Sequence, residues 1–191
     1  MNNSFSHEPF DHKFLDQYIS EFNQIQPDWS QFIKRSEEDI TADHLLLDLL
    51  KCSDDRHKAN AVFDKFAIQL NQYEMLNSFN GKMILLLEQK FPKCSIIKSG
   101  HFYYPPGGGM QWHTNADTPY LRCYLNYSRN GDSYFKYYDQ EQEKTVVSQD
   151  HTGWNLRTFE IGKQGKDLFW HSVYSNTDRV SLGFRIINNL K

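Results

Sequence analysis

The sequence predicts an α+β protein in which helices pack on one side of an antiparallel sandwich or jelly roll. Up to about residue 93, apolar residues recur at steps of three and four, the period of a helix with one buried face. After Lys93 the period changes to two, and turn signals divide the remaining chain into about eight short strands. A block of helices followed by a block of strands is typical of the α+β class.

Four segments of the first half have the helical pattern. Thr41 is the expected N-cap of the second, because a hydroxyl there can accept a backbone N–H bond before the apolar run begins. Pro92 would stop the fourth, since proline cannot continue a helix. The predicted helices span residues 10–22, 40–50, 59–73 and 81–91.

The second half alternates apolar and polar residues in short runs. Asn130-Gly131 between two aromatic-rich runs is the clearest hairpin signal, because this dipeptide suits a two-residue turn. The predicted strands span residues 96–104, 110–115, 119–128, 132–139, 144–149, 154–161, 167–174 and 179–187. No linker separates the halves, so we expect a helical region 1–93 packed on a β domain 94–191 as one structural unit.

Composition narrows the class of partner and the compartment. The formal net charge is -3 without a concentrated basic run, which argues against a nucleic-acid partner. No apolar run reaches the roughly 20 residues of a membrane span, and the first residues lack a signal-peptide pattern. Three cysteines without paired spacing fit a reducing compartment. We therefore expect a cytoplasmic protein without a membrane partner.

Two histidines stand out on the predicted strands. His113 and Asn115 would share a face of the strand 110–115, because residues two apart point the same way. His171 lies in the apolar run "DLFWHSVYS". Taken alone, such a histidine is more often a hydrogen-bonded core residue than a ligand, and the two could meet only through sandwich folding.

The last predicted strand, "DRVSLGFRII", has a polar face. Arg179, Ser181 and Arg185 share this face, and aliphatic and aromatic residues take the other. A guanidinium beside a hydroxyl suits a carboxylate, since the planar fork can bind both oxygens and the hydroxyl adds a third donor. The alternative is a pair of solvent-facing arginines on an edge strand.

The order His-x-Asn, His171 and then Arg179-x-Ser181 on successive strands resembles the iron(II)/2-oxoglutarate-dependent oxygenase superfamily. That family uses His-x-Asp/Glu, a distal histidine and an Arg-x-Ser or similar pair, and the likeness covers about residues 98–187. It implies a double-stranded β-helix of about eight antiparallel strands. It also implies a non-haem dioxygenase that uses Fe(II), 2-oxoglutarate and molecular oxygen to hydroxylate a small molecule or a peptide side chain.

Local stretches extend the resemblance. "YYPPGGGMQWHTN" and "RCYLNY" are similar to the metal strand and the following strand of the prolyl-hydroxylase branch, which implies that Tyr124 and Tyr104 reach 2-oxoglutarate. "RVSLGFR" is similar to the final strand of the nucleic-acid demethylase branch. By that likeness Arg179 and Ser181 bind the distal carboxylate, and Arg185 approaches the other end or the substrate.

The resemblance implies His113, Asn115 and His171 as the catalytic metal ligands. Asn115 departs from the family pattern, because its amide oxygen lacks the charge of a carboxylate. Three alternatives follow: Asn115 ligates with 2-oxoglutarate supplying the anion, Asp117 replaces it, or the site binds iron poorly or not at all. The rival functions are a catalytically silent jelly-roll binding module and a cupin-type enzyme with another metal. The Arg179 motif favours the cosubstrate reading over the cupin, which has no need of it.

Overall fold

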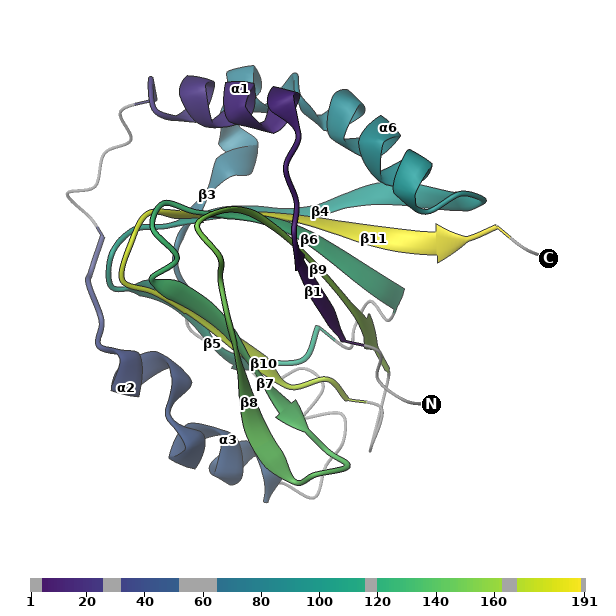
Figure 1. Ribbon diagram of the computed structural model, residues 1–191. Coiled ribbons are helices and arrows are strands. Elements are labelled where there is room, and N and C mark those ends of the chain that lie inside the picture. The colour runs from purple at the N-terminus through teal and green to yellow at the C-terminus, as the bar shows by residue number, and fades with distance from the viewer. Residues whose placement is uncertain (1–4, 26–31, 52–64, 116–119, 163–167, 190–191) are drawn as a thin grey trace.

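Two antiparallel sheets lie face to face with helices on their outer sides, a jelly-roll-like α+β arrangement (Figure 1). The computed structural model describes residues 5–25, 32–51, 65–115, 120–162 and 168–189. All strand pairings in these ranges are antiparallel. The α+β class and the antiparallel sheets predicted from the sequence are confirmed.

The larger sheet has six strands and the smaller has five. In spatial order the larger sheet contains β1 (Ser6–Pro9), β9 (Gly153–Ile161), β6 (Tyr120–Ser128), β11 (Arg179–Asn188), β4 (Cys94–Tyr104) and β3 (Ile68–Gln69). The smaller contains β2 (Lys65–Phe66), β5 (Gly108–His113), β10 (His171–Ser175), β7 (Ser133–Asp139) and β8 (Lys144–Gln149). Strands β4 to β11 correspond to the eight predicted strands, while β1 to β3 add edges from the first half of the chain.

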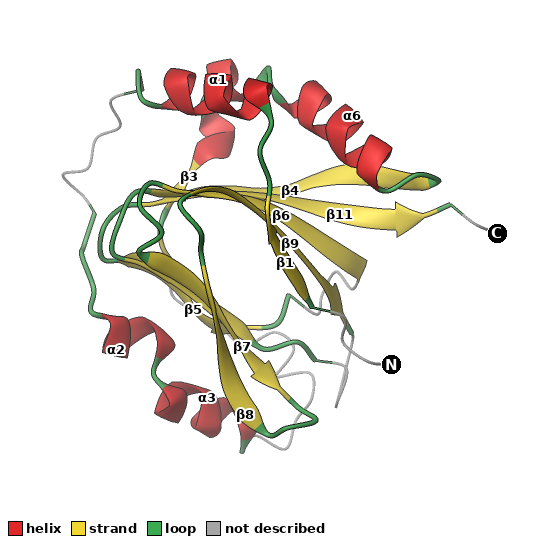
Figure 2. Ribbon diagram, viewed as in Figure 1, coloured by secondary structure: helices red, strands yellow, loops and turns green. Residues whose placement is uncertain are grey.

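Helices cover both outer faces rather than one (Figure 2). The helices are α1 (Lys13–Phe22), α2 (Glu37–Thr41), α3 (Asp43–Leu50), α5 (Glu74–Asn77) and α6 (Asn80–Lys90), with a 3-10 turn at Leu70–Gln72. Helices α1 and α6 lie over the larger sheet, and α2 contacts β5 and β10 of the smaller one. The prediction of helices on one side is wrong, because each sheet has an apolar outer face to bury.

Two details of the helical half also differ from the predictions. In the predicted helix 59–73, Lys65–Phe66 and Ile68–Gln69 pair as β2 and β3 with β5 and β4, so the hydrogen bonds of sheet edges override the helical spacing of the apolar residues. Thr41 ends α2 instead of capping a helix. The N-cap of α2 is Ser36, which forms a capping box with Asp39. The N-cap of α3 is Ala42, which makes no side-chain capping bond. None of the helices in the described ranges is long and apolar enough to cross a membrane.

The main core lies between the larger sheet and helices α1 and α6. It contains Leu15 of α1, Leu87 of α6, and Leu182 and Phe184 of β11, all fully buried. The alternate residues of β11, beginning with Arg179, therefore face the other way, toward the smaller sheet. The predicted division of β11 into an apolar face and a polar face is confirmed.

Candidate active site

A cavity of about 180 Å³ lies between the two sheets. Both sheets contribute to its wall: the smaller sheet supplies the histidines and the larger sheet supplies an arginine, a serine and two tyrosines. Of the eight residues predicted for the site, seven line it, namely Tyr104, His113, Asn115, Tyr124, His171, Arg179 and Ser181. The fold thus brings together side chains from remote parts of the sequence.

His113 and His171 meet because their strands are neighbours. They are Cα partners where β5 pairs with β10, and their ring centroids lie 4.0 Å apart. The pairing register shifts between His171 and Val173, at the end of β10 where His171 stands. The two imidazoles share one side of the smaller sheet, which is the arrangement that joint binding of one ion requires.

Both rings are held in the same tautomer. Nδ1 of His113 lies 2.7 Å from the carbonyl oxygen of Gln111, and Nδ1 of His171 lies 2.9 Å from that of Phe169. A carbonyl only accepts, so each Nδ1 carries the proton and each Nε2 keeps a lone pair. Backbone bonds of this kind orient histidines that ligate metals.

Burial keeps the two rings uncharged. It lowers the pKa of His113 to about 4 and the pKa of His171 well below its usual value, with the neighbouring His113 lowering the latter further. His171 stacks on Phe135 with ring centroids 5.2 Å apart. At neutral pH both imidazoles are therefore neutral, the form that can coordinate a cation.

Asn115 reaches the site by a route that the sequence did not indicate. β5 ends at His113, not at residue 115, and Asn115 adopts a left-handed backbone with φ of 55°. Its Nδ2 lies 3.2 Å from Nε2 of His171 and donates to that lone pair. The predicted strand end is wrong, yet the amide still adjoins the histidine. Asp117, the alternative ligand, lies outside the described residues.

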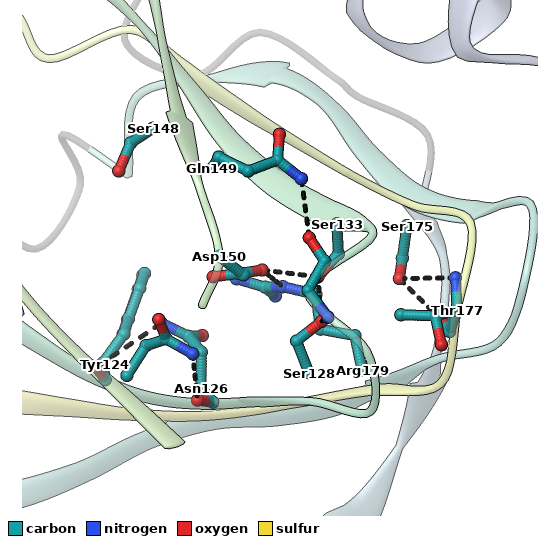
Figure 3. Close-up of polar contacts among 12 residues, drawn as sticks. Tyr124, Asn126, Ser128, Ser133, Ser148, Gln149, Asp150, Ser175, Thr177 and Arg179 are labelled. Atoms are coloured by element: carbon teal, nitrogen blue, oxygen red, sulfur yellow. Dashed lines mark hydrogen bonds and ion pairs between the residues drawn. The ribbon is translucent and has the colours of Figure 1, made fainter. Parts of the chain in front are cut away.

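Arg179 of the cavity wall belongs to a buried ion cluster (Figure 3). Nε of Arg179 donates to Oδ2 of Asp150 at 2.8 Å, and Nη1 of Arg157 donates to Oδ1 of the same carboxylate. All three side chains are at most 1% exposed. Two guanidinium groups and one carboxylate leave the cluster with one positive charge.

The carboxylate of Asp150 stays ionised despite its burial. Burial alone would raise its pKa, but the charges of Arg179 and Arg157 and a 2.6 Å hydrogen bond from Ser133 lower the pKa to about 2. Asp150 therefore offsets only one of the two guanidinium charges at neutral pH. An anion in the cavity would offset the other.

One guanidinium nitrogen of Arg179 lacks a hydrogen-bond partner among the described residues. Its Nη1 atom is buried and has no hydrogen-bond partner among the described residues. The guanidinium carbon lies 5.3 Å from the ring centroid of Tyr104. A buried, unpartnered guanidinium nitrogen is costly, and a carboxylate supplies what it lacks.

Tyr124 fills the gap that Gly183 leaves on β11. The two residues are Cα partners, and a Cβ at Gly183 would lie 2.8 Å from both Cε1 of Tyr124 and the carbonyl oxygen of Gly100. Burial raises the pKa of Tyr124 and of Tyr104, so both phenols stay protonated and can donate hydrogen bonds.

Arg185, the eighth predicted residue, does not line the cavity. It is half-buried and is the Cα partner of Arg122 in β6, farther along β11. Six strand residues span about 20 Å, which exceeds the reach of one small diacid. The prediction that Arg185 helps to bind the cosubstrate is therefore not supported by its position.

Asp150 and Arg157 of the ion cluster are the site residues that sequence reasoning missed. Arg157 does not line the cavity, and its run "WNLRTF" does not indicate a buried carboxylate partner. Asp150 follows β8 in "SQDHTGW", where an acidic residue looks like an ordinary turn residue. Its partners are 7 and 29 residues away, so only the fold shows its role.

Comparison with solved structures finds a likeness that covers nearly the whole chain. The chain is similar to a Pseudomonas putida prolyl-4-hydroxylase, with a TM-score of 0.51 and 14% sequence identity, covering 97% of this chain and 93% of that one. At this identity the likeness bears on the fold alone. No protein-family model matches the sequence, and no curated protein matches it.

Proposed function

We propose that this chain is a non-haem dioxygenase dependent on Fe(II) and 2-oxoglutarate, and that its two sheets form the double-stranded β-helix of that superfamily. The observation that supports this most is that one cavity is lined both by two neutral imidazoles and by an arginine with an unpartnered guanidinium nitrogen. The substrate would be a small molecule or a peptide side chain, and the product a hydroxylated one.

The donor set fits Fe(II). Two imidazole lone pairs are ligands that iron accepts readily, and the amide oxygen of Asn115 is a weaker, neutral third. His113, His171 and Asn115 would hold the metal. No group of three or more His, Cys, Asp or Glu side chains within the described ranges offers another metal site. Without a carboxylate, the site depends more strongly on an anionic cosubstrate for charge balance.

The surroundings of Arg179 fit the distal carboxylate of 2-oxoglutarate. Arg179 would bind it through Nη1, with Ser181 adding a hydroxyl and the phenols of Tyr104 and Tyr124 adding donors. When bound, Fe(II) and 2-oxoglutarate together supply the power to insert one oxygen atom of O₂ into a C–H bond, with succinate and carbon dioxide as coproducts. The aromatic rings around His171 exclude water from this chemistry.

The amide at residue 115 favours a second candidate function. A neutral third ligand weakens iron binding, so the chain could instead be a silent jelly-roll module that binds a dicarboxylate through Arg179. The two candidates share the anion site and differ in the metal. Binding of Fe(II) therefore separates them.

The test is an anaerobic titration of the apoprotein with Fe(II) and then 2-oxoglutarate, followed by visible absorption. The dioxygenase gives a weak charge-transfer band that is lost in His113→Ala and His171→Ala. His101→Ala is the matched control, because His101 is buried on β4 but does not line the cavity. Succinate release on exposure to oxygen then reports turnover. A wild-type protein without the band, together with an Asn115→Asp variant that gains it, would leave the silent module as the function.

A further inference from the structure

We propose that Asp150 is a positioning residue that aims the guanidinium of Arg179 at the cavity, with Arg157 as its fixed anchor. The inference rests on the proposed function for the identity of the ligand, a five-carbon dicarboxylate. It deepens that proposal by assigning the cosubstrate specificity to a carboxylate that does not line the cavity.

Arg157 is fixed on all sides by the fold. Its Nη2 donates to the carbonyl oxygen of Ser148 at 2.9 Å, its Nε lies 3.3 Å from Oγ of the same serine, and its Nη1 binds Asp150. His7 of β1 holds that serine in turn, because its Nε2 donates to Oδ1 of Asn155 and its Nδ1 accepts from Oγ of Ser148. Arg157 therefore has no free donor edge and cannot serve as the anion ligand itself.

Asp150 connects this anchor to Arg179. Its Oδ1 accepts from Arg157, and its Oδ2 accepts both from Nε of Arg179 and from Oγ of Ser133. The single proton of Ser133 goes to the carboxylate, so the 2.8 Å contact between Ser133 and Ser128 has Ser128 as the donor. Every contact of Asp150 thus has a defined direction, and the carboxylate has one orientation.

Two contacts then fix the plane and the rotation of Arg179. The bond from Nε to Asp150 fixes the rotation, and the ring of Tyr104 lies against the guanidinium, with 5.3 Å from its centroid to the guanidinium carbon. Nη1 is left as the unpartnered donor. The distance from this nitrogen to the histidines then selects the length of the diacid, because a misaimed guanidinium would fit several lengths equally badly.

A simple charge effect predicts the opposite outcome from positioning. Asp150→Asn leaves two unopposed guanidinium charges, so an effect of charge alone would tighten anion binding. The double variant Asp150→Asn/Arg157→Met keeps the single net positive charge of the wild-type cluster and removes the device that aims Arg179. It also avoids leaving Arg157 buried without its partner, which guards against loss of the fold.

The experiment measures dissociation constants for oxaloacetate, 2-oxoglutarate and 2-oxoadipate by calorimetry, with Mn(II) as a metal that does not turn over. Positioning predicts that the double variant binds 2-oxoglutarate at least tenfold more weakly and loses the preference for five carbons. In turnover, the KM for 2-oxoglutarate rises at least tenfold, whereas kcat at saturation changes less than threefold. Unchanged affinity and length preference in the double variant would overturn the inference, and so would tighter binding by Asp150→Asn.

Two controls separate the possible failures. Leu87→Ala destabilises the main core far from the cavity, and it should leave the length preference intact. If wild-type protein binds no 2-oxoglutarate, the proposed function fails, and the same variants are titrated with glutarate, which needs no metal. Glutarate binding that weakens at least tenfold in the double variant supports positioning. Absent or unchanged glutarate binding refutes it.

Discussion

Replacement of Asn115 by aspartate should destabilise the metal-free protein and increase the stabilisation that a bound metal provides. Nδ2 of Asn115 donates to Nε2 of His171 at 3.2 Å, and Nδ1 of that histidine already uses its proton elsewhere. An ionised aspartate only accepts, so two acceptors would face each other in a half-buried site. The loss of such a bond costs about 0.5–1.5 kcal/mol of folding free energy. The left-handed backbone adds no cost, because aspartate tolerates it almost as well as asparagine.

The assay is thermal unfolding with and without Mn(II). For a chain of 191 residues, the lost bond lowers the Tm by about 1–6 °C without metal. If the variant binds metal tenfold more tightly, an excess of metal stabilises the variant by about 1.4 kcal/mol more than wild type, which offsets most or all of this loss. Asn130→Asp is the matched control, because residue 130 is exposed and aspartate keeps the turn acceptor for the Asp132 N–H. The reasoning is refuted if Asn115→Asp matches wild type without metal, or if Mn(II) stabilises both proteins equally.

Three further predictions concern Arg179, Gly183 and Asp150. Arg179→Met should weaken 2-oxoglutarate binding by about a hundredfold, the upper range for a hydrogen bond to a charged group, while Arg185→Met should leave the calorimetric Kd unchanged. Gly183→Ala should cost about 1–3 kcal/mol in urea denaturation, because its Cβ would meet Tyr124 and the backbone at 2.8 Å; wild-type stability there would contradict the packing. The pKa of Asp150 is lowered from 3.8 to about 2, so the stability it contributes is complete above pH 3.8 and is lost as the pH falls toward 2. Urea denaturation across that range should show that the free energy of unfolding falls by about 2 kcal/mol more in wild type than in Asp150→Asn/Arg157→Met. An equal fall in the two proteins would contradict this prediction.

The strands were predictable because their signal is local. Alternation and turn dipeptides mark β4 to β11, and Asn130-Gly131 indeed joins β6 to β7. The short strands β2 and β3 were not predictable, because their hydrogen bonds are made with β5 and β4 and leave no pattern in their own residues. The helical spacing of the segment 59–73 was misleading, because pairing with β5 and β4 determines the structure of β2 and β3.

Part of the site was predictable and part was not. The motifs of His113 and Arg179 could be found because each lies on an alternating strand, and His171 could be found because it interrupts an apolar run. The left-handed turn at Asn115 depends on how the chain leaves β5, which no residue pattern states. Asp150 could not be found, since a buried carboxylate and a turn carboxylate look the same in a sequence and only its partners distinguish them.

The edge position of β1 has a practical consequence for anyone who shortens this chain. β1 pairs with β9 along Ser6–Pro9, so a version that starts after Pro9 would uncover the β9 edge and invite intermolecular strand pairing and aggregation. Such a truncation would also delete His7, which holds Ser148 beside Arg157. Loss of these residues would therefore loosen the ion cluster that holds Arg179, and a tag at the N-terminus should leave the pairing of Ser6–Pro9 with β9 intact.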